Sequence, residues 1–156
     1  MPELLRLDLS EVLLLLLVAD INAELDLKWV DFPSEESLRA SLSMLTTLGA
    51  VEEDANKITE TGRRMAAYPV HPRFARMLLE ALESECGAEA ALCVALCQCR
   101  SIFIRSSSVE LSEFCHPDDI SDFQPMIRAW LFAFRAQFDF NQCDAYGINA
   151  KAAREA

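Results

Sequence analysis

Apolar residues recur every three or four positions along most of this 156-residue chain, and this spacing restricts the fold more than any other feature. Such a period places side chains on one face of an α-helix. The clearest example is a stripe expected to face a hydrophobic core: Phe123, Ile127, Trp130, Leu131, Phe134 and Phe138. With only 4 glycines and 6 prolines, the chain has few of the residues that tight turns require. A mainly α fold is therefore predicted.

Two helices are predicted in the first third of the chain. The first runs from about Asp8 to Ala19 and is apolar on every face, as a helix in the middle of a core would be. Ser34 is placed to cap the second helix, and Gly49 is placed to end it. The stretch between the two helices, residues 20–33, has no clear helical period.

A polar turn follows the second helix and predicts a β-hairpin. Residues 50–52 and 57–59 are typical of short strands, and they flank the turn at residues 53–56. Thr59 can then cap a further short helix. Two helices followed by a hairpin are the element order of a winged-helix fold, in which the hairpin is the wing. We therefore predict a winged-helix domain over residues 1–69.

From residue 70 onward the pattern is helical only. Pro72 suits the first turn of a helix, and Gly87 separates that helix from the next. A last helix is expected to begin at Asn149 and to be cut short at Ala156, which suggests that the natural protein continues. These elements predict a helical-bundle domain over residues 70–156.

The net charge of -11 argues against a free-standing DNA-binding protein, because such proteins draw most of their affinity from Lys and Arg on phosphates. The helix before the predicted wing begins with Glu35 and Glu36, which would meet the phosphates of a major groove. An acidic module could still line a strand that more basic domains contact. The arginines considered for such contacts are Arg63, Arg64, Arg73, Arg76, Arg100, Arg105, Arg128 and Arg135.

No catalytic or metal-binding constellation is expected in this sequence. There is no Gly-rich phosphate loop followed by Lys and Ser or Thr, and no nucleophile elbow. Cys115 and His116 are adjacent, which points their side chains apart, and His71 lies in a predicted turn. The aromatic stripe of the long helix is interpreted as core rather than as a base-stacking surface.

The cysteines and the apolar runs indicate a cytoplasmic protein. Cys93, Cys97 and Cys99 do not have the spacing of a zinc site and are interpreted as reduced, packed thiols. The apolar run at residues 12–19 has eight residues, whereas a membrane span takes roughly twenty. No membrane association is therefore expected.

Three ordered motifs resemble the helicase-associated region of DEAH-box ATP-dependent RNA helicases. Residues 48–51 read Leu-Gly-Ala-Val, and residues 58–69 read Ile-Thr-Glu-Thr-Gly-Arg-Arg-Met-Ala-Ala-Tyr-Pro. Residues 71–78 read His-Pro-Arg-Phe-Ala-Arg-Met-Leu. The family pattern is a Leu-Gly-Ala turn, then Leu-Thr-x-x-Gly-x-x-Met-Ala-x-x-Pro, then Pro-Arg-x-x-x-Met-Leu. Cys143 and residues 147–155 are most similar to the bacterial HrpB-type branch.

The resemblance implies a winged-helix domain and a ratchet-like helical bundle, which follow two RecA-like motor domains and precede an OB-fold. In such helicases ATP and Mg²⁺ bind to the motors, so this chain needs no cofactor of its own and has no activity alone. The implied role is to brace the motors and to guide single-stranded RNA. Expected RNA contacts are Arg73, Arg76, Arg100 and Arg105. The alternative is a free-standing winged-helix adaptor that binds only proteins.

Overall fold

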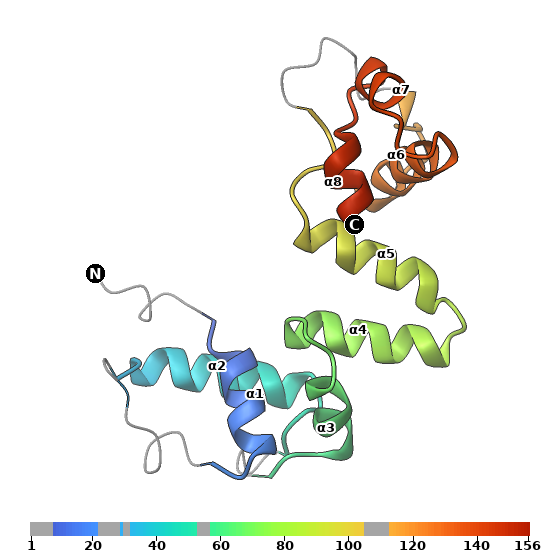
Figure 1. Cartoon of the computed structure of the whole chain (residues 1–156). Coiled ribbons are helices and arrows are strands. Elements are labelled where there is room, and N and C mark those ends of the chain that lie inside the picture. Colours follow the sequence, from blue (N-terminus) through green and yellow to red (C-terminus); the bar gives the residue numbers. More distant parts are fainter. Residues whose placement is uncertain (1–7, 22–28, 30–31, 53–56, 105–112) are drawn as a thin grey trace. The chain divides into compact units, whose positions relative to one another are not determined.

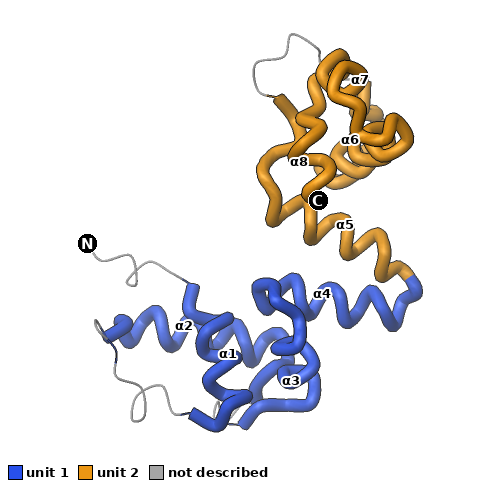
Figure 2. The backbone as a smooth tube through the Cα atoms, viewed as in Figure 1, with its two compact units in different colours: residues 1–85 blue, residues 86–156 orange. Residues whose placement is uncertain are grey.

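The computed structural model describes residues 8–21, 29, 32–52, 57–104 and 113–156, and the described part is mainly helical (Figure 1). The backbone divides into two compact units, residues 1–85 and 86–156 (Figure 2). Each unit has its own hydrophobic core, and each is described by itself.

The first unit contains helices α1 (Ser10–Val18), α2 (Glu35–Thr47), α3 (Glu60–Ala66) and α4 (Pro72–Glu83). Helix α1 packs against the other three helices. The core residues of the unit are Leu9, Leu13, Leu14, Leu38, Leu45, Ala50, Val51, Met65, Ala75 and Leu79. The prediction that the first helix is surrounded by core is wrong for one face, because Val12 and Leu15 are 42% and 51% exposed.

The helix ends follow the predicted capping chemistry. The Ser34 hydroxyl accepts a hydrogen bond from the Ser37 amide at 3.1 Å. After α2, Gly49 takes φ +72°, a left-handed conformation that glycine adopts without steric cost. These local features confirm the predicted bounds of the second helix to within about two residues.

The predicted β-hairpin is not formed as two strands in the described residues. The pairing is a single antiparallel bridge between Val51 and Ile58, closed by a hydrogen bond from the Glu52 amide to the Lys57 carbonyl at 2.9 Å. One bridge is too short to make a ladder. The turn at the tip of the predicted wing, residues 53–56, lies outside the described residues.

The second unit contains α5 (Gly87–Gln98), α6 (Phe123–Arg135), α7 (Phe140–Ala145) and α8 (Ala150–Glu155). Helix α6 contacts both α5 and α8. The connection after α5 is fixed to the chain before α8, since the Asn149 amide donates to the Ile102 carbonyl at 2.7 Å. The buried residues of this core are Leu96, Ile102, Ala129, Ala133, Cys143, Ile148, Ala152 and Ala153.

The division into compact units falls after α4, whereas the sequence pattern changes at residue 70. Helix α4 packs against α1 and α3 and is therefore part of the first unit. The predicted domains, 1–69 and 70–156, stay predictions.

Candidate functional site

The Thr-x-x-Gly part of the second motif builds the junction between the bridge and α3. The Thr59 hydroxyl accepts from the Gly62 amide at 3.0 Å and donates to the Gly49 carbonyl at 2.6 Å. A Cβ atom on Gly62 would lie 2.2 Å from the carbonyl oxygen of Ala50, so only glycine fits there. Met65, one turn later, is fully buried. The role of these motif residues is therefore to stabilise the fold.

The first residue of the third motif joins α4 to the start of α1. His71 Nε2 lies 3.0 Å from a carboxylate oxygen of Asp8 and 3.2 Å from the hydroxyl of Ser10, which is fully buried. His71 Nδ1 accepts from the Arg73 amide at 3.3 Å. Because Nδ1 accepts here, Nε2 is the ring nitrogen that carries the proton.

Asp8, His71 and Ser10 do not form a nucleophilic triad. In such a triad the acid and the nucleophile contact different ring nitrogens, whereas here both contact Nε2. Burial raises the pKa of Asp8, but hydrogen bonds from Ser10 and His71 outweigh it, and the pKa lies below its ordinary value. The cluster is a hydrogen-bonded link between the start of α1 and the start of α4.

Of the four arginines predicted to contact RNA, the structure describes three. Arg73 is exposed on α4, where its Nε donates to the sulfur of Met44 at 3.0 Å. Arg76 pairs with Glu80 at 2.9 Å. Arg100 is exposed after α5, and Arg105 lies outside the described residues. Neither Arg73 nor Arg100 makes an ion pair with another described residue.

The structure does not place these arginines in one site. Arg73 and Arg76 belong to the first unit and Arg100 to the second. Their assignment as RNA contacts stays a prediction. Of the other arginines considered, Arg64 pairs with Glu83 at 3.6 Å and is half exposed.

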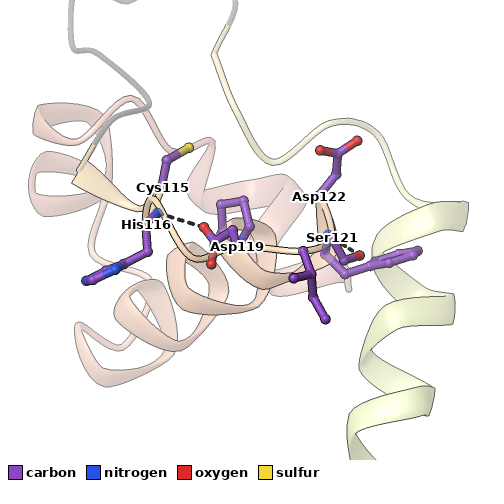
Figure 3. A pocket seen from close by; sticks show the side chains of 8 residues that line it. Cys115, His116, Asp119, Ser121 and Asp122 are labelled. Carbon is purple, nitrogen blue, oxygen red and sulfur yellow. Dashed lines mark hydrogen bonds between the residues drawn. The ribbon is translucent and has the colours of Figure 1, made fainter.

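A pocket of about 520 Å³ lies at the start of α6. Its lining residues are Cys115, His116, Asp119, Ile120, Ser121, Asp122, Phe123 and Pro125. The side chains of Cys115 and His116 point apart, so they form no nucleophile and base pair (Figure 3). Asp119 is bound by Arg128 and by the His116 amide, and both contacts lower the pKa of its carboxyl group although partial burial raises it. Arg128 therefore fixes this loop rather than offering a free cation.

Three aromatic residues of the predicted stripe form a cluster of rings at the end of α6. The rings of Trp130 and Phe134 are stacked, with centroids 5.2 Å apart and an interplanar angle of 14°. Phe138 meets both rings edge-on, at 6.2 Å and 6.1 Å. We call these three residues the aromatic platform. The prediction that the whole stripe faces the core is wrong for Phe134, which is 56% exposed, and for Leu131, which is 37% exposed.

No helix in the described part of the chain is long and apolar enough to cross a membrane. Within the same residues, no group of three or more His, Cys, Asp or Glu side chains is placed to hold a metal ion.

Comparison with known proteins gives two matches to family models. Residues 41–70 match the winged-helix part of the helicase associated domain (HA2), and residues 71–125 match its ratchet-like part. The chain is 34% identical over 103 residues to the mouse (Mus musculus) ATP-dependent RNA helicase DHX33, an alignment that covers 65% of this chain. It is 32% identical over 117 residues to DHX33 of Drosophila melanogaster, covering 74% of this chain.

A longer alignment is made with a splicing helicase of fission yeast. The chain is 26% identical over 161 residues to the pre-mRNA-splicing factor ATP-dependent RNA helicase prp22 of Schizosaccharomyces pombe, and 99% of this chain is covered. In these three alignments the chain spans only 14–17% of the relative.

Proposed function

Residues 41–125 of this chain are a helicase-associated region with winged-helix and ratchet-like parts, and we propose that the chain is an accessory domain of a DEAH-box ATP-dependent RNA helicase. The observation that carries this proposal is the uninterrupted succession of the two matches, 41–70 and then 71–125. In the proposed parent, RecA-like motors bind ATP and Mg²⁺ in the cytoplasm, and an OB-fold follows this chain.

The proposed mechanical role is to brace the motors. Three apolar side chains of the first unit, Val12, Leu15 and Ile21, are 37–51% exposed on and just after α1. Val12 and Leu15 are three positions apart and therefore neighbours on one face of α1, and an exposed apolar patch is typical of a surface that another domain covers. The contacts of α1 with α2, α3 and α4 would pass a displacement of this surface to the rest of the unit.

The proposed nucleic-acid role is to guide a single strand. Arg73 and Arg100 are exposed and make no ion pair with other described residues, so their charges are free for phosphates. Arg76 is held by Glu80 and would contribute less. The overall charge of -11 makes this domain a minor contributor to affinity in the parent.

Salt-dependent RNA binding tests this role. The affinity of the chain for a fluorescein-labelled dodecauridylate would be measured by anisotropy at several salt concentrations. Arg73→Ala and Arg100→Ala are each expected to reduce the slope of log K against log salt by about 0.7, the value for one single-strand phosphate contact. Arg39→Ala is the matched control, because Arg39 is exposed but paired with Glu35 at 3.7 Å. Equal slopes for all three variants would contradict the guiding role.

A finer placement within the family rests on residues alone. Cys143 and residues 147–155 support the HrpB-type branch, and Cys143 and Ile148 are both buried in the second core. The adaptor alternative gains no specific support from the structure.

A further inference from the structure

The aromatic platform combines an exposed ring with a rigid support. The Trp130 side chain is held in position by α8, because its indole Nε1–H donates to the Ala153 carbonyl at 2.8 Å. Phe134 stacks on the indole and remains 56% exposed. Its ring therefore has one face on Trp130 and is held in place before any ligand arrives.

The third ring of the platform, that of Phe138, is carried by a strained backbone just after α6. Gln137 and Phe138 both have positive φ, at 54° and 56°. A bulky residue in this left-handed region is an outlier that costs about 1–3 kcal/mol and persists only where surrounding contacts enforce it. The Phe138 ring meets Trp130 and Phe134, and the Arg154 guanidinium lies 5.6 Å from its centroid.

The charge around the platform differs from that of the rest of the chain. Residues 123–156 carry four Lys and Arg and three Asp and Glu, whereas residues 1–122 carry ten and twenty-two. Arg135, next to Phe134, is exposed and makes no ion pair with a described residue. The neighbouring acid, Asp139, caps α7 by accepting from the Gln142 amide at 2.9 Å. Residues 123–156 therefore lack the acidic excess of the chain as a whole.

We propose that the aromatic platform is a base-stacking site, in which an unpaired base of single-stranded RNA lies on the exposed ring of Phe134 and Arg135 contacts a flanking phosphate. This proposal rests on the proposed function. Aromatic rings bind bases of single strands without regard to sequence, because every base has a π-face. A ring that is already ordered loses little conformational entropy on stacking, which favours binding.

Nuclear magnetic resonance of the ¹⁵N-labelled chain tests the site directly. The indole Nε1–H of Trp130 reports on the platform, and that of Trp29 is an internal reference. Hexa-adenylate is expected to shift the Trp130 indole resonance, whereas a ribose-phosphate hexamer without bases is expected to leave it unchanged. Phe134→Ala is expected to remove the shift and to weaken binding by about five- to a hundred-fold, the range for one stacked base.

Two variants separate stacking from a structural effect. Phe140→Ala is the matched control, because Phe140 is 70% exposed and has no ring partner among the described residues, and it should bind as the unchanged chain does. Phe134→Leu keeps an apolar side chain without a π-face and should bind as Phe134→Ala does.

The outcomes distinguish failure of the site from failure of the proposed function. If hexa-adenylate shifts the Arg73 or Arg100 resonances but not that of the Trp130 indole, the base-stacking site is overturned and RNA guidance stands. The same holds if Phe134→Ala and Phe140→Ala bind equally, and the exposed ring is then a surface for a neighbouring protein domain. If no resonance shifts, both proposals are overturned.

Discussion

Replacing Gly62 by alanine would insert a methyl group into a space that the fold does not have. The new Cβ would lie 2.2 Å from the Ala50 carbonyl oxygen and 2.8 Å from Cγ1 of Ile58. The Ile58 side chain can move, but the carbonyl belongs to the backbone. That carbonyl also accepts the Thr59 amide at 3.0 Å, so moving it strains the base of the bridge.

Two unfavourable contributions and one favourable contribution set the expected loss of stability in Gly62→Ala. Overpacking costs about 2–3 kcal/mol, and weakening the hydrogen bond to Ala50 costs about 1 kcal/mol. The higher helix propensity of alanine returns about 1 kcal/mol. The expected net loss is about 2–3 kcal/mol in the free energy of unfolding of the first unit. For a unit of 85 residues this lowers Tm by about 10–20 °C.

Thermal unfolding followed by circular dichroism at 222 nm measures this loss. Gly49→Ala is the matched control, since a Cβ there meets nothing within 4 Å and the cost comes only from its φ of +72°. Gly49→Asn should recover much of that cost, because asparagine tolerates left-handed backbone. At Gly62, by contrast, serine should destabilise as much as alanine. A Gly62→Ala chain that unfolds at or above the Tm of the unchanged chain would refute the close approach to Ala50.

Three further predictions concern stability and thiol reactivity. Thr59→Ala should lower the free energy of unfolding by about 1 kcal/mol in chemical denaturation, because it removes the cap of α3, and an unchanged midpoint would contradict that role. Asp8→Asn should destabilise the chain at neutral pH by less than about 1 kcal/mol, since the carboxyl is 42% exposed. Because the folded pKa of Asp8 lies below its ordinary value of 3.8, its contribution is present above that pH and lost below it. Urea titrations should therefore show the two chains converging in acid, and a constant difference would count against the link. In the folded chain a maleimide should label Cys86 and Cys97 quickly, whereas Cys143 should react only after denaturation, because it is fully buried and burial raises the pKa of its thiol.

Local features of this fold could be predicted because their causes lie within a few residues. Ser34, Thr59 and Asn149 each cap a helix through a side-chain oxygen and an amide three residues later. Gly49 ends α2 because of its own backbone freedom. Asp139 caps α7 in the same way, through the Gln142 amide. This helix was not predicted, because its six residues are too few to show a helical period.

Features that depend on distant contacts could not be predicted. The link between Asp8 and His71 joins residues 63 positions apart, so no sequence window contains it. The helical period predicted which apolar residues of α6 lie on one face. It could not predict how far other helices cover each of these side chains. The fully buried positions are the small residues Ala129 and Ala133, and Phe134 extends beyond the core they define. The predicted wing had strand-like residues but forms only one bridge in the described part of the chain.

Sequencing the gene upstream of this region tests the central claim most directly. If the chain is an accessory domain of a DEAH-box helicase, the same reading frame should encode a Gly-rich phosphate loop with Lys and Ser or Thr, followed by an Asp-Glu-Ala-His box. A reading frame that starts at Met1 and encodes no motor would contradict the claim, and the winged-helix adaptor would replace it.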